Sequence, residues 1–172
     1  RDTVKRIADG CFERCVFAGG TRFGTQVESI GERAFAGAVF SGAAARSAQG
    51  YELVTGSGET IALPGVTGAV LLPESVRTLG ERAFEGADFQ GSSLVIQADV
   101  EEIPARCFAE AKNLAEASFS GQNLKTIEKE GFYALTSDGD TGVASGESLL
   151  LLPDTVESIG ERAFAAGSAS HT

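Results

Sequence analysis

Histidine and cysteine, the side chains that most often act as nucleophiles, general bases and zinc ligands, are scarce in this sequence. The only histidine is His171, in a stretch of small residues next to the C-terminus, where it has no fixed surroundings. A serine or cysteine triad needs an internal imidazole, and a zinc site built on histidines needs more than one. The sequence therefore argues against both kinds of site.

The three cysteines stand at repeat positions that hold alanine in most of the other copies. Cys11 and Cys107 lie several coils apart, on the order of 20 Å at one strand spacing per coil, which is too far for a disulfide. A bridge between Cys11 and Cys15 is conceivable but would strain a short turn. We predict buried free thiols rather than a metal site or a nucleophile. Cys11 and Cys107 share a position with Ala34, Ala83 and Ala163, and Cys15 shares one with Ala38, Ala87 and Ala111.

Carboxylates and glycine-rich loops give only weak signals for chemistry. Pairs such as Glu101 and Glu102 recur at exposed repeat positions, where a solvated surface explains them better than an acid–base pair. Gly56 and Gly58 lack the third glycine and the following helix of a dinucleotide fingerprint, and no Walker pattern occurs. The sequence therefore predicts no catalytic residue and no cofactor.

One loop, at about 136–148, has oxygen-bearing side chains. Asp138, Asp140 and Glu147 loosely resemble a calcium site, but their spacing does not match an EF-hand loop. A solvated loop is the favoured interpretation, with calcium binding as the alternative. We predict no metal site.

Composition limits the kinds of partner. The chain has 172 residues with a formal net charge of -10, and 42% of the residues are hydrophobic, enough for one domain spanning residues 1–172. An excess of acidic residues argues against nucleic acid and against anionic membranes. No apolar run approaches the roughly 18 residues that a membrane span needs, so we expect no membrane insertion by this segment.

A repeat organises nearly the whole chain. Six segments share an aliphatic residue, a second aliphatic residue three positions later and a phenylalanine five positions after that, and three of them contain the string GERAF. Successive copies start 23, 49, 24, 24 and 32 residues apart, which predicts about six to seven coils of roughly 24 residues. The six copies are Val4/Ile7/Phe12, Val27/Ile30/Phe35, Val76/Leu79/Phe84, Val100/Ile103/Phe108, Leu124/Ile127/Phe132 and Val156/Ile159/Phe164.

Insertions are predicted at about 41–69 and 136–148, where the spacing exceeds one coil. The first contains two extended runs around Gly56-Ser57-Gly58, which favours a protruding β-hairpin, although a degenerate coil starting near Tyr51 is the alternative. Because the first motif lacks a preceding strand, we expect the sequence to be a piece of a longer protein. Strands are predicted ahead of the other motifs, at 70–72, 94–96, 117–119 and 150–152, with a weaker one at 21–23.

The segments LPESVRTLGERAFEGA at 72–87 and LPDTVESIGERAFAAG at 152–167 resemble the BspA-like leucine-rich repeat of bacterial surface proteins. The resemblance implies a right-handed repeat solenoid with short parallel β-strands on one face and short helical or 3-10 turns. It also implies an extracellular or bacterial cell-surface location and a frequent link with adhesion, and it supplies no shared catalytic residues. The sequence departs from the pattern in its two insertions and in its fourth and fifth motifs.

The strand face is the candidate binding surface. If alternate strand residues point outward, three aliphatic side chains lie in one exposed column. Coverage of this column by the insertion at 41–69 or by a neighbouring segment is the favoured interpretation, and contact with a partner or ordinary exposed aliphatic side chains are the alternatives. The favoured function is a non-enzymatic interaction or adhesion module for a protein or glycan, such as host extracellular matrix, and the alternative is a passive spacer. We expect a monomer or weak end-to-end association. The outward column comprises Arg22, Leu71, Val95, Ser118 and Leu151.

Overall fold

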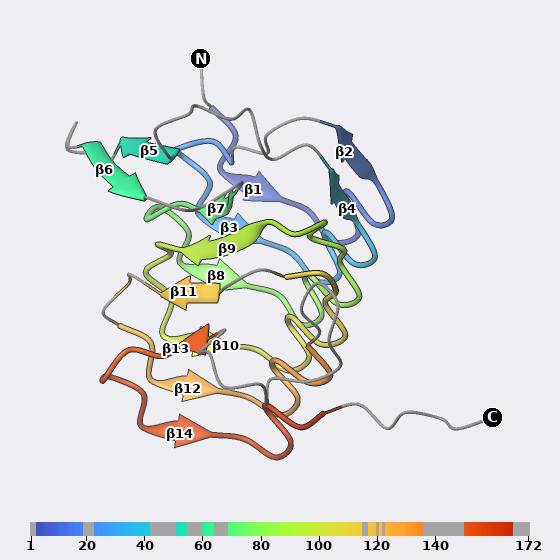
Figure 1. Ribbon diagram of the computed structural model, residues 1–172, viewed down its shortest axis with the longest axis vertical. Coiled ribbons are helices and arrows are strands. Elements are labelled where there is room, and N and C mark those ends of the chain that lie inside the picture. The colour runs from blue at the N-terminus through green and yellow to red at the C-terminus, as the bar shows by residue number, and fades with distance from the viewer. Residues whose placement is uncertain are drawn as a thin grey trace.

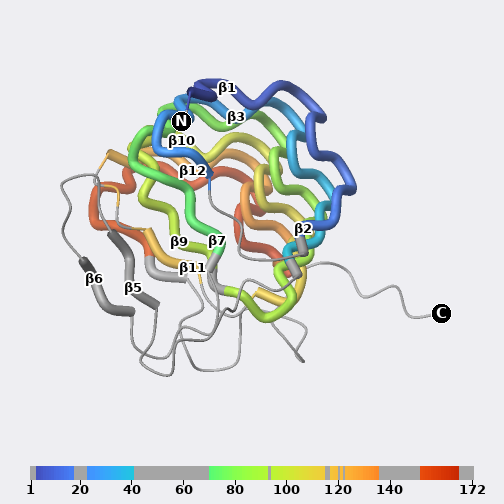
Figure 2. Tube along the Cα trace, turned by 90° about the horizontal axis from the view of Figure 1, so that it is seen from above, coloured from blue at the N-terminus to red at the C-terminus, as the bar shows by residue number. Residues whose placement is uncertain are grey.

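The computed structural model describes residues 3–18, 23–41, 51–54, 60–63, 69–114, 117–119, 121, 123–135 and 150–166. In these residues the chain winds into a stack of coils whose strands pair in parallel from one coil to the next (Figure 1). Seen along the stack, the coils superimpose, and the rows of strands lie on different sides of the coil (Figure 2). The predicted repeat solenoid is confirmed.

The predicted row of strands ahead of the motifs is present, and its members pair in the order β13-β11-β9-β7. These strands lie close to where the sequence placed them. Phe23, in the weaker candidate at 21–23, belongs to no strand. The row comprises β7 (Ala69–Leu72), β9 (Ser93–Ile96), β11 (Ala117–Phe119) and β13 (Leu150–Leu151).

Besides the predicted row of strands on one face, two-residue strands run through the motifs themselves and form a second row. Ile7 pairs with Ile30, and Ile30 with Leu79, so the aliphatic residues of successive motifs lie side by side. The row comprises β1 (Arg6–Ile7), β3 (Ser29–Ile30), β8 (Thr78–Leu79), β10 (Glu102–Ile103), β12 (Thr126–Ile127) and β14 (Ser158–Ile159). A third, short row pairs β2 (Val16–Ala18) with β4 (Val39–Ser41).

The segment that contains the phenylalanine forms a chain of turns, and no helix occurs among the described residues, which corrects the expectation of helical turns. Alternate amides serve different purposes. The amide of Phe35 donates to the carbonyl of Ala83 in the next coil (2.7 Å), whereas that of Ala36 donates back to Arg33 (3.1 Å). In a helix both amides would donate to carbonyls four residues earlier in the same segment. Because every second amide here bonds the next coil, the segment forms turns and not a helix.

In each described turn, the residue two positions before the phenylalanine has a left-handed backbone conformation. Glycine tolerates this conformation best, yet most copies place arginine there, with φ of 52° at Arg33 and 55° at Arg106. The hydrogen bonds to the neighbouring coil offset the local strain. The equivalent residues are Gly10, Arg33, Arg82, Arg106, Glu130 and Arg162.

Phenylalanine rings stack along the axis and form the core. Phe84 lies between Phe35 and Phe108, with ring centroids 5.1 and 5.2 Å away and interplanar angles of 8° and 11°. The predicted continuous column of rings is confirmed, and it runs through six coils. Its members are Phe12, Phe35, Phe84, Phe108, Phe132 and Phe164.

The first insertion contains a hairpin. β5 (Tyr51–Val54) and β6 (Thr60–Leu63) pair antiparallel. β3 pairs directly with β8, which leaves no place in the stack for a degenerate coil between them. The antiparallel pairing of β5 with β6 agrees with the hairpin, which the sequence favoured over a degenerate coil. The second insertion, at 136–148, and its candidate calcium ligands lie outside the described residues.

Candidate binding surface

The structure brings the predicted outward residues of the strand row into one column. Leu71 pairs with Val95, Val95 with Ser118, and Ser118 with Leu151 in the register of the β7–β13 sheet. The fifth predicted member, Arg22, lies outside the described residues. The column therefore exists as a structural feature along four strands.

Val95, at the centre of this column, is buried rather than exposed. Its neighbours Leu94 and Ile96 face the core and are 1% and 0% exposed, so Val95 faces the opposite side of the sheet, yet it is only 8% exposed. Leu71 and Ser118 are half-buried. At Leu71, Val95 and Ser118 the outward column is thus a partly sheltered strip and not an open aliphatic patch.

The cysteines behave differently from one another. Cys107 is fully buried, and desolvation raises the pKa of its thiol despite hydrogen bonds from the backbone of Ala83 and Phe84, so it is held as an inert thiol. Cys11 and Cys15 are free but exposed, which corrects the prediction of buried thiols for these two. They belong to the first coil, which has a described neighbour on one side only.

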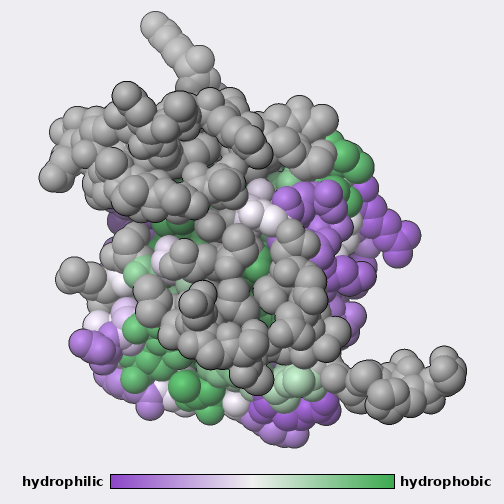
Figure 3. Space-filling view, viewed as in Figure 1, coloured by the Kyte–Doolittle hydropathy of each residue, from purple (hydrophilic) through white to green (hydrophobic). Residues whose placement is uncertain are grey.

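A network of ion pairs runs along the turns, on a side of the molecule where hydrophilic residues gather (Figure 3). Arg106 contacts Glu85 at 2.6 Å and Glu110 at 2.8 Å, and it also bonds Glu130. Burial alone would lower the pKa of Arg106, but the three carboxylates outweigh it and raise the pKa. Every carboxylate in this network has a cationic partner, so the network stabilises the coil stack rather than offering a free acid or base.

Tyr133 is attached to the same network. The guanidinium of Arg162 lies 4.7 Å from the centre of its ring and that of Arg106 lies 5.9 Å from it, which are cation–π distances. Sequence analysis missed the network because its members come from different coils. The available signal was the recurrence of arginine two residues before the column phenylalanine, with glutamate directly after that phenylalanine in the first and third coils.

Among the described residues, no group of three or more histidine, cysteine, aspartate or glutamate side chains is placed to hold a metal ion. The exposed pair Glu101 and Glu102 has no such neighbours. The same residues include no helix with the length and apolar character of a membrane span.

Comparison with known families gives one match. The sequence pattern of the BspA type leucine rich repeat region fits residues 1–42 and 67–138 in six copies, which is more than half of the chain. No curated protein and no solved structure matches the chain. The unmatched residues 43–66 include the hairpin β5–β6, and beyond residue 138 the turn of the last coil still bonds the preceding one, as between the amide of Phe132 and the carbonyl of Ala163 (2.8 Å).

Proposed function

The chain belongs to the BspA-type leucine-rich repeat family, and from this premise we propose that it is a non-enzymatic adhesion module of a bacterial cell-surface or secreted protein. Repeats of this kind serve as protein-interaction modules. The proposed partner is an extracellular protein or glycan. The proposed contact surface is the strand face that contains Leu71, Val95 and Ser118, together with the hairpin of the first insertion.

The observation that supports this proposal most strongly is the position of the hairpin. The chain leaves the stack at β4, forms the antiparallel pair β5–β6, and returns as β7, the strand that contains Leu71. The stack continues through this point without a gap, because β3 pairs with β8. A segment that the stack does not need for its own continuity is free to serve recognition, as loops on rigid scaffolds usually do.

A passive spacer is the alternative, and the continuous phenylalanine column favours it. The rings keep centroid separations of 5.1 to 5.4 Å across both insertions, so the stack is a stiff rod whether or not the insertions bind anything. A spacer requires only this rod. The two functions therefore differ in what they demand of the insertion.

The deciding experiment compares binding of two forms of the chain to an array of extracellular-matrix proteins and glycans. One is the unchanged chain, and in the other residues 41–68 are replaced by Gln-Gly-Ser, the sequence that joins Phe89 to β9 at 90–92. We expect binding by the first and not by the second. A chain shortened only at 136–148 serves as the matched control for the loss of a loop.

Substitutions on the strand face sharpen the result. Leu71→Arg places a charge in the proposed contact strip and is expected to abolish binding, whereas Gln26→Arg adds the same charge at an exposed residue outside both rows of strands and is expected to leave binding unchanged. Circular dichroism confirms that each variant is folded. Absence of binding by the unchanged chain would favour the spacer, and equal binding by all variants would place recognition on another surface.

A further inference from the structure

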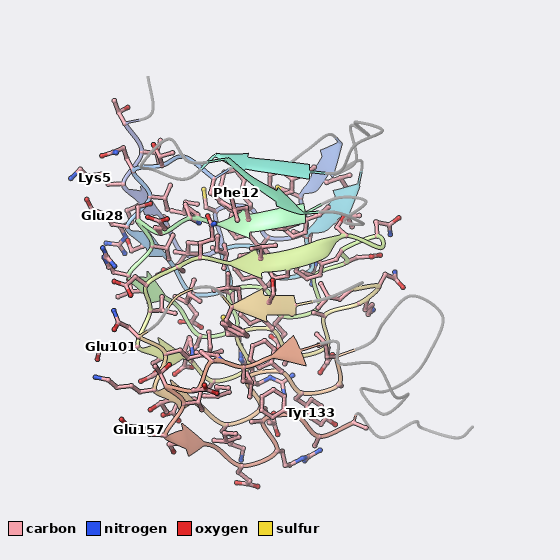
Figure 4. All side chains as sticks on the ribbon, turned by 60° about the vertical axis from the view of Figure 1, so that its left-hand side comes forward. Lys5, Phe12, Glu28, Glu101, Tyr133 and Glu157 are labelled. Atoms are coloured by element: carbon pink, nitrogen blue, oxygen red, sulfur yellow. The ribbon has the colours of Figure 1, made fainter. Side chains whose placement is uncertain are left out.

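A column of exposed charges with alternating sign runs along the motif row of strands. Backbone bonds set the register: the amide of Glu28 donates to Lys5 (2.7 Å), that of Arg77 to Glu28 (2.8 Å), and that of Lys125 to Glu101 (2.9 Å). The members labelled in Figure 4 point outward along the same side of the stack; they are Lys5, Glu28, Glu101 and Glu157. From the first coil to the last, the column reads Lys5, Glu28, Arg77, Glu101, Lys125 and Glu157.

These charges are open to solvent and only loosely satisfied within the chain. The side chains of Arg77 and Glu101, at the centre of the column, are 57% and 74% exposed. Lys5 contacts Glu28 at 2.9 Å, Lys125 contacts Glu101 at 3.9 Å, and Arg77 bonds Asp99. Exposed pairs of this kind are individually weak, so the side chains can rearrange toward an added partner at little cost.

The order of the signs makes the column complementary to its own reverse. It reads plus, minus, plus, minus, plus, minus, and read backwards it gives the opposite sign at every position. Two copies placed face to face and related by a two-fold axis parallel to the strands would oppose Lys5 to Glu157, Glu28 to Lys125, and Arg77 to Glu101. A parallel arrangement centred on the column would instead oppose each charge to itself, so the pattern selects the antiparallel pair.

The neighbouring column also fits this antiparallel arrangement. It has one residue per coil, and reversal opposes Arg6 to Ser158, Ser29 to Thr126, and Thr78 to Glu102, with no pair of like charges. These residues are exposed or half-buried and polar, and they can exchange hydrogen bonds across an interface. The column comprises Arg6, Ser29, Thr78, Glu102, Thr126 and Ser158.

Glycines in the motif row let adjacent coils of the same chain approach closely. A side chain at Gly31 would place its Cβ 2.3 Å from a carboxylate oxygen of Asp9, and one at Gly80 would place it 2.3 Å from the amide nitrogen of Glu32. Beyond the glycines, reversal opposes Glu32 to Lys129 favourably and Asp9 to Glu161 unfavourably, the latter only at the two ends of the stack.

We propose that the motif row is an interaction surface for a second copy of this chain, which binds antiparallel through the alternating column. The face extends over five coil spacings, about 24 Å, and is narrow, so the dimer is weak, with a dissociation constant in the micromolar range or above. This surface is separate from the β7–β13 sheet. Dimerisation would present two such sheets together and raise the avidity for a repetitive ligand.

The test is sedimentation equilibrium of the whole chain at physiological ionic strength over a wide range of protein concentration. Arg77→Glu opposes glutamate to Glu101 twice in the symmetric dimer and is expected to raise the dissociation constant at least about tenfold. The double variant Arg77→Glu with Glu101→Arg restores both contacts and is expected to recover dimerisation.

The double variant also separates dimer contacts from contacts within the chain. Inside one chain it creates two like-charge neighbours, Glu28 beside the new glutamate and Lys125 beside the new arginine, as many as the single variant creates. If alternation served only the stability of one chain, both variants would lower the thermal unfolding midpoint and neither would dimerise. A monomeric unchanged chain, or association that Arg77→Glu leaves unaffected, as end-to-end contact would be, overturns the proposal.

Discussion

The turns that contain the phenylalanine column and the connections that follow them differ in how much change the chain accepts. Between Gly31 and Ala38 the backbone forms hydrogen bonds within the turn and with the coils on both sides. No described turn has gained or lost a residue. Both insertions instead fall between the turn and the next strand of the β7–β13 row. Variation in length is thus confined to this connection.

The difference is physical because each turn residue has a fixed neighbour above or below it. An extra residue in the turn would shift alternate amides out of register with the next coil and leave them buried without an acceptor. An extra residue in the connection only lengthens a loop, and loop-closure entropy rises slowly with length.

Removing a ring from the middle of the phenylalanine column is expected to cost most. Phe108→Ala deletes a fully buried ring that stacks on Phe84 and Phe132 at 5.2 Å on both sides, and we expect a loss of about 3–5 kcal/mol in the free energy of unfolding by urea. Phe164→Ala is the control, because Phe164 is half-buried and, among the described residues, stacks on Phe132 alone. Equal losses for both would show that stacking along the column does not determine the cost.

Two glycines near the turn are expected to resist substitution for different reasons, one because there is no space for a side chain and the other because of its backbone conformation. Gly80→Ala places a Cβ 2.3 Å from the amide nitrogen of Glu32, and the resulting overpacking is expected to cost about 2–3 kcal/mol. Gly86→Ala meets nothing within 4 Å but has φ of 66°, so its cost is conformational and about 1 kcal/mol. The same urea titration measures both, and a larger loss at Gly86 would contradict the close contact between coils.

Sequence alone predicted the features with a strong local signal. The phenylalanine column follows from six equivalent positions with a strict period. The hairpin follows from two extended runs around a glycine turn. The motif strands escaped prediction because two paired residues per coil produce no alternation of apolar and polar residues. The left-handed conformation was signalled by glycine at Gly10, but arginine at Arg33 and Arg106 concealed it, since arginine has no preference for that region.

The candidate site was less predictable than the fold because burial depends on segments distant in the sequence. Alternation placed Val95 on the outer side of its strand, and the register confirms that position, but no local pattern indicates that it is 8% exposed. Cys11 shares its repeat position with the buried Cys107 but is exposed, and it lies in an end coil with one described neighbour instead of two. Equivalent positions in a repeat therefore do not have equivalent surroundings.

The ion-pair network tests how far charge contributes to the turn side. Arg106→Gln leaves Glu85 and Glu130, which are 18% and 13% exposed, without their principal cation, and we expect a loss of about 2 kcal/mol. Arg82→Gln is the matched control. Arg82 has the same backbone conformation but is 45% exposed and contacts Glu85 only at 3.9 Å, so its loss should stay below about 0.5 kcal/mol. Equal losses would show that the network acts as a set of ordinary surface charges.

Replacing residues 41–68 by Gln-Gly-Ser is expected to change stability little, although it alters the most residues. The hairpin bonds with itself, and the pairs between β3 and β8 exist without it, so the free energy of unfolding should change by no more than about 1 kcal/mol. Urea titration of this variant beside Phe108→Ala compares the two regions directly. If the shortened chain lost as much as the variant without the ring, the insertion would be part of the core, and its proposed role as a freely variable recognition segment would have to be abandoned.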